Sequence, residues 1–170
     1  MAVILAKPIH PKKFNDKAFY REFELEARKT AKDIKKDFEK TVSTWNNKPK
    51  FEMVIAVGPK SIDILVGTDD EIYGYVDKGT EEHLITPKKS GGTLAFKSRY
   101  KPKTIPNLIG SRGGGSSGDT VFAKWVIHPG TKARNFSKTL QKKWEKIYKG
   151  RIEKALKRAN QKSGHAYTRR

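Results

Sequence analysis

Cysteine is absent from the 170 residues of this chain. Its absence excludes disulfide bonds and zinc sites built from thiolates, and it agrees with a reducing compartment. Long apolar runs are also missing. The apolar opening at residues 1–6 is too short for a signal peptide or a membrane span, so we expect a soluble protein with no membrane partner. The length suits one domain that buries a core without covalent cross-links.

Groups that could carry out a reaction are scarce as well. The four histidines are His10, His83, His128 and His165. None belongs to an HxH or HxxxH pair that would place two imidazoles on one face. His83 and His128 could meet across a sheet, but histidines at strand ends on a wet surface are the simpler interpretation.

Two further clusters have a structural explanation that needs no ligand. The glycine-rich run 110–118 lacks the Lys-Ser/Thr ending of a phosphate-binding loop. The acidic cluster 69–71 fits the first turn of a helix, where the helix dipole favours carboxylates, better than it fits a magnesium site. We therefore expect no enzymatic activity, no metal and no cofactor.

Acidic residues are outnumbered by basic ones. Lysine and arginine total 37 against 18 aspartates and glutamates, for a formal net charge of +19. A surface of this kind attracts nucleic acid and other polyanions. The excess is greatest after residue 132, where a basic helix is predicted. We expect contacts with DNA or another polyanion at Lys138, Lys142, Lys146, Lys149 and Arg151.

Periodicity predicts an α+β fold. Apolar residues spaced by three and four predict a helix from about Asn15 to Thr44, and Asn135 is a candidate N-cap for a second long helix. Alternating patterns predict strands at 51–57, 62–66 and 121–128, with shorter strands near 83–86 and 93–96. We expect one small antiparallel sheet packed against the two long helices, with Ile34, Phe38, Trp125 and Ile127 buried together.

The domain is expected to span residues 14–159, between an N-terminal arm at 1–13 and a basic tail at 160–170. Residues 97–120 lack apolar periodicity and are rich in glycine and serine, so we expect a projecting flexible loop. Its apolar residues precede the glycine run and are candidate anchors for a partner: Tyr100, Ile105, Leu108 and Ile109. A passive surface linker is the alternative interpretation of this loop.

The order of several short segments resembles a known family. A Tyr-Val-Asp-Lys-Gly-Thr run at 75–80 is followed by segments at 85–88, 94–96, 128–131 and 134–136. The residues that carry the resemblance are Tyr75, Gly79, Thr80, Pro129, Gly130, Arg134 and Phe136. In this order they resemble the minor-tail or tail-completion proteins of tailed bacteriophages, over roughly residues 51–156.

The resemblance implies a structural virion subunit that joins head to tail by assembling into a homo-oligomeric ring. The partners that it implies are head-completion or neck proteins, a tail-tube or tail-terminator protein, and phage DNA in the channel. It implies a place in the virion after synthesis in the bacterial cytoplasm. The alternative function is nonspecific nucleic-acid binding through the basic C-terminal helix.

Overall fold

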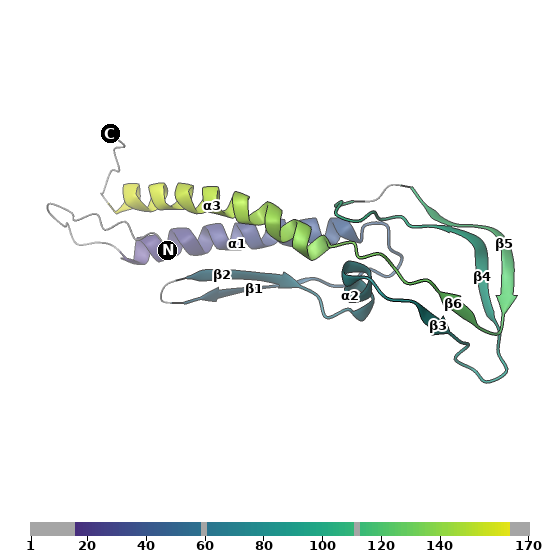
Figure 1. The fold of residues 1–170 in the computed structure, drawn as a ribbon. Helices are drawn as coiled ribbons and strands as arrows, with labels where there is room; N and C mark the ends of the chain where they lie inside the picture. The colour runs from purple at the N-terminus through teal and green to yellow at the C-terminus, as the bar shows by residue number, and fades with distance from the viewer. Residues whose placement is uncertain (1–15, 59–60, 111–112, 164–170) are drawn as a thin grey trace.

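A computed structural model describes residues 16–58, 61–110 and 113–163. It confirms the α+β class, with two long antiparallel helices that lie side by side (Figure 1). The helices are α1 (Asp16–Thr41), α2 (Glu71–Lys78) and α3 (Phe136–Lys162). The strands are β1 (Glu52–Val57), β2 (Ile62–Gly67), β3 (His83–Ile85), β4 (Leu94–Lys101), β5 (Gly115–Ala123) and β6 (Val126–His128). Asn15, the expected N-cap, lies outside the described residues.

The strands do not join into the one sheet that the sequence predicted. They form three separate antiparallel pairs, β1 with β2, β3 with β6, and β4 with β5. The β1–β2 hairpin lies along the helix pair, whereas the other two pairs extend from its far end (Figure 1). The predicted strand 121–128 is split because Lys124 and Trp125 leave the ladder between β5 and β6.

The core lies where α1, α3 and α2 meet. Its buried members come from the three helices and from the loop that follows α1 and precedes β1: Phe38, Val42, Phe51, Tyr73, Phe136, Leu140 and Trp144. The predicted burial of Phe38 is confirmed, and Ile34 packs against this cluster. The prediction that Trp125 and Ile127 are buried was wrong. These residues are 60% and 55% exposed, and they lie on an extended segment that none of the described helices covers.

The start of α3 is capped from another element. Asn135 occupies the N-cap position, as predicted, but it is in the left-handed conformation, with φ 54°, and its side chain makes no capping hydrogen bond. Instead the backbone N–H of Ser137 donates to Oδ1 of Asp77, at the end of α2, at 3.2 Å. Of the acidic cluster expected in the first turn of a helix, only Glu71 lies in the first turn of α2; Asp70 is its N-cap, and the Asp70 carboxylate accepts from the Tyr73 N–H at 2.7 Å.

The segment 97–120 is more ordered than the sequence predicted. Its two ends are strand residues, because β4 and β5 pair from Leu94 with Ala123 to Lys101 with Gly115. The connecting residues 102–110 turn back toward the body of the molecule. We call β4, β5 and residues 102–110 the arch; Figure 1 shows it at the end of the molecule away from the start of α1 and the end of α3.

Candidate functional site

Most residues of the family-like motif meet at one junction between the body and the arch. Thr80 and Thr131 form an isolated antiparallel bridge, with reciprocal N–H to carbonyl bonds of 3.0 Å. Gly79 and Gly130 lie beside this bridge at φ 84° and 83°. A Cβ on Gly79 would lie 2.7 Å from the carbonyl oxygen of Thr131, and one on Gly130 would overlap the carbonyl of Thr80. Only glycine allows this close crossing of two backbones.

Arg134 ties the arch to the junction. Its side chain is buried, and its guanidinium donates to Thr104 Oγ1 at 3.1 Å and to the carbonyl of Lys132 at 2.7 Å. Its carbonyl accepts from the N–H of Asn107 at 2.9 Å. Hydrogen bonds to Arg134 therefore hold residues 102–110 against the body of the same chain. Phe136 enters the core next to Tyr73, while Tyr75 and Pro129 are exposed, so five of the seven motif residues assemble here.

The four expected anchor residues divide into two groups. Ile109 packs against the core cluster and Leu108 is half-buried, so both sit against their own chain. Tyr100, on β4, and Ile105 remain exposed. The sequence did not show this division, because all four lie in one stretch without periodicity.

The arch and the strands beside it expose several large apolar side chains. Phe96, Val121, Phe122, Trp125 and Ile127 join Tyr100 there, and the exposed fraction of Phe122 reaches 69%. Ala95 pairs with Phe122, and Phe96 with Val121, so the apolar side chains alternate between the two faces of the ribbon. No described element covers either face of this ribbon.

His83 and His128 do meet across a strand pair. They are register partners between β3 and β6, with ring centroids 5.1 Å apart. His128 Nδ1 accepts a hydrogen bond from the Gly130 N–H at 3.1 Å, and His83 Nδ1 lies 2.8 Å from the carbonyl oxygen of Glu81. No third histidine or carboxylate completes a metal-binding group within the described ranges.

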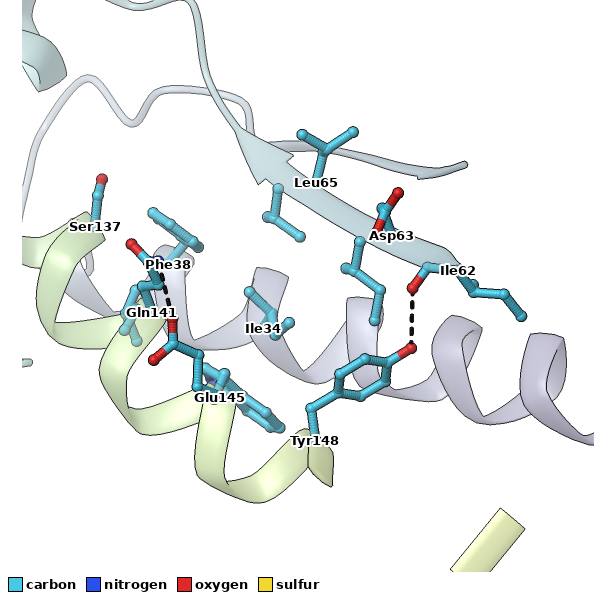
Figure 2. Close-up of a pocket in the computed structure, with 13 residues that line it drawn as sticks. Ile34, Phe38, Ile62, Asp63, Leu65, Ser137, Gln141, Glu145 and Tyr148 are labelled. Atoms are coloured by element: carbon cyan, nitrogen blue, oxygen red, sulfur yellow. Dashed lines mark hydrogen bonds between the residues drawn. The ribbon is translucent and has the colours of Figure 1, made fainter. Parts of the chain in front are cut away.

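A cavity of about 450 Å³ lies between β2 and the two long helices (Figure 2). Apolar side chains line most of it, including Ile34, Phe38 and Ile62. The Tyr148 hydroxyl donates to the carbonyl of Ile62 at 3.3 Å, and burial raises the pKa of this tyrosine. Leu65 points away from the helices in Figure 2 and is exposed. The cavity holds no arrangement of nucleophile and base.

The basic residues of α3 belong to two different surfaces. Lys138, Lys142, Lys146 and Lys149 are exposed on the outer side of the helix, as expected. Arg151 instead faces α1, where it binds Asp33 at 2.8 Å and lies 5.2 Å from the Trp144 ring centroid. The predicted polyanion contacts therefore do not form one surface.

The sequence did not show that α1 and α3 join through buried acids. Glu22 and Glu26 are buried and bind Arg158, and Glu22 also binds Lys162. Asp37 is buried against Lys143 and Trp144. One signal in the sequence could have indicated this interface. The C-terminal helix has an excess of cations, and the N-terminal helix has acidic residues spaced by four, which lie on one face.

No protein-family model, curated protein or solved structure matches this chain. Within the described part of the chain, no helix is both long enough and apolar enough to cross a membrane.

Proposed function

We propose that this protein is a structural subunit of a tailed-bacteriophage virion that completes the tail or joins it to the head. The observation that carries the proposal is the arch, which exposes large apolar side chains on both faces of a two-stranded ribbon. A two-stranded ribbon has marginal stability alone, and exposed apolar clusters of this kind mark interaction surfaces. Copies of the chain in a ring, together with neighbouring neck or tail proteins, would cover these side chains.

The geometry of the junction supports the same proposal. The motif segments whose order resembles tail-completion proteins cross at the Thr80–Thr131 bridge, beside Gly79 and Gly130, and Arg134 lies at the base of the arch. The motif therefore sets the position of the surface that we propose for assembly. The mechanism is the burial of the arch between subunits, and it needs no chemical step.

Deletion of the gene from the viral genome that encodes it should yield heads and tails that fail to join, as counted by negative-stain electron microscopy. The intact gene supplied in trans should restore joined particles. The double variant Phe122→Ser/Trp125→Ser should not restore them, whereas Tyr20→Ser/Leu25→Ser, which changes two exposed apolar residues of α1, should. A genome that forms no virus particles, or full joining with the arch variant, would overturn the proposal.

The alternative function, nonspecific nucleic-acid binding, is supported by the exposed lysines of α3. On the outer face of α3 these lysines are interspersed with Glu145 and Glu153. A concave basic surface does exist elsewhere on the helix pair.

A further inference from the structure

A groove of about 460 Å³ runs between α1 and α3, and charged side chains form its whole lining. Six are cations and two are carboxylates: Lys29, Lys32, Lys36, Arg151, Lys154 and Arg158, with Glu26 and Asp33. With 3.6 residues per turn, the three α1 lysines lie on the side of that helix opposite Ile34 and Phe38. The groove is therefore distinct from the apolar cavity of Figure 2.

The two carboxylates are already neutralised by arginines. Glu26 binds Arg158 at 2.6 Å, and Asp33 binds Arg151 at 2.8 Å. Lys29 is spaced for an ion pair with Asp33 on the same helix, but no such pair forms. Among the described residues, four groove lysines have no carboxylate partner: Lys29, Lys32, Lys36 and Lys154. Their four charges are therefore available to an anion from outside the chain.

We propose that this groove binds the phosphate backbone of double-stranded DNA through Lys29, Lys32, Lys36 and Lys154. The α1 lysines span about 10 Å along the helix axis. A DNA duplex carries one charge per about 1.7 Å of its axis, so several phosphates fall within that span. Binding is independent of sequence, because the groove has no side chain set to read base edges.

The lining also distinguishes a duplex from other polyanions. Single strands are held by aromatic side chains on which bases stack, and no aromatic residue lines the groove. A membrane-surface site would place apolar side chains beside the lysines, and none lines the groove. This site goes beyond the proposed assembly role, which uses the arch and not the helix pair.

Fluorescence anisotropy with a short labelled duplex of arbitrary sequence tests the site. Replacement of the four groove lysines by glutamine removes four positive charges. The matched control replaces Lys138, Lys142, Lys146 and Lys149 by glutamine, which removes the same charge from the outer face of α3. All eight side chains are exposed, so both variants should keep the thermal midpoint and helical circular dichroism of the parent.

Affinity of the groove variant should fall at least ~10-fold at ~100 mM salt, and the log–log salt slope should flatten by about 3 to 4 units, at about 0.9 unit per lost phosphate contact. The control should change the slope by less than about 1 unit. A groove variant with the four lysines replaced by arginine should bind as the parent does. Equal losses in both glutamine variants, no loss in the groove variant, or equally tight binding of a single strand would each overturn the proposal. Sedimentation without DNA reports separately on assembly.

Discussion

At the scale of single residues, Asp37 accepts three hydrogen bonds, and two of them, from Lys143 and Trp144, join α1 to α3. Its carboxylate accepts from Lys143 at 2.6 Å, from Lys40 at 3.0 Å and from the Trp144 indole at 3.0 Å. Burial acts to raise the pKa of Asp37, but the hydrogen bonds from the two lysines outweigh burial and hold the pKa below its usual value. The indole N–H is buried and depends on this carboxylate for its hydrogen bond.

Asp37→Ala should lower the free energy of unfolding by about 2–4 kcal/mol, because it leaves a buried indole donor without an acceptor. The two lysines are largely exposed and return to water at little cost. Asp37→Asn keeps an acceptor for the indole and should cost roughly half as much. Urea denaturation of both variants measures the difference. Equal losses would show that the charge, and not the indole bond, is what stabilises.

Gly130 and Gly150 should respond in opposite directions to the same substitution. Gly130→Ala should destabilise by at least about 2 kcal/mol, since a left-handed backbone alone costs about 1–2 kcal/mol and the added Cβ meets the Thr80 carbonyl. Gly150 lies within α3 with open space around its Cβ position. Gly150→Ala should therefore stabilise by about 0.5–1 kcal/mol. Thermal unfolding of the two variants decides, and a neutral Gly130→Ala would contradict the tight crossing.

At the scale of elements, ion pairs define how α1 and α3 lie together. Hydrogen bonds from Lys162 and Arg158 lower the pKa of Glu22, and the bond from Lys162 has the larger effect. Asp37 has a lowered pKa at the other end of the same interface. A carboxyl group whose pKa is lower in the folded state stabilises that state above its unfolded pKa, near 4.

Stability should therefore be nearly constant from pH 6 to 8 and should fall as the pH drops below about 4.5, through the folded pKa values of Glu22 and Asp37. Thermal midpoints measured across this range provide the test. In the double variant Glu22→Gln/Asp37→Asn the acid decline should become shallower, because two of the responsible groups are gone. If the thermal midpoint of the double variant falls with pH as steeply as that of the parent, other carboxylates cause the loss of stability in acid.

The helices were predictable from the sequence because each presents one apolar stripe to the core. The stripe on α1, with Ala27, Ala31 and Phe38, is buried as expected, whereas Leu156 of α3 proved exposed. The α3 helix also runs without a break through Gly150, although glycine is a poor helix former. The strands predicted near 93–96 and at 121–128 include the start of β4 and the end of β5. The rest of these two strands was not predicted, because both of their faces are exposed and no in–out alternation arises.

The candidate sites were predictable only where local sequence decides the geometry. The 75–80 run and the Pro-Gly corner near residue 130 both belong to the family-like motif, and the Thr80–Thr131 bridge joins them. Arg151 was expected to contact a polyanion, but it forms an ion pair with Asp33 of α1, which is distant in sequence. The sequence did not identify the groove lysines of α1 as a candidate site. They lack carboxylate partners only because the arginines of α3 form ion pairs with Asp33 and Glu26.

At the scale of the whole molecule, two opposing features act on association. Exposed apolar side chains of the arch favour contact between subunits, whereas a formal net charge of +19 opposes it. Salt screens the repulsion over a Debye length of about 10 Å at 0.1 M, but leaves apolar burial intact. Association should therefore depend on ionic strength.

The purified protein should be monomeric at low salt and should associate as salt is raised to about 0.5 M, in sedimentation velocity experiments. The arch variant Phe122→Ser/Trp125→Ser should remain monomeric throughout, because it lacks two of the apolar side chains that association would bury. Stable rings at low ionic strength without a partner would contradict the balance described here.

The ion pairs between α1 and α3 also have an evolutionary consequence. A carboxylate lost at Glu22, Asp33 or Asp37 leaves a cation on the other helix, Lys162, Arg151 or Lys143, without its carboxylate partner. Selection should therefore act on the pair and not on either residue alone. Among descendants of this sequence, Glu22 should covary with Lys162, Asp33 with Arg151, and Asp37 with Lys143. The exposed lysines of the outer α3 face should vary independently of the residues on α1. Covariation among related sequences would therefore identify the charges that hold the two helices together.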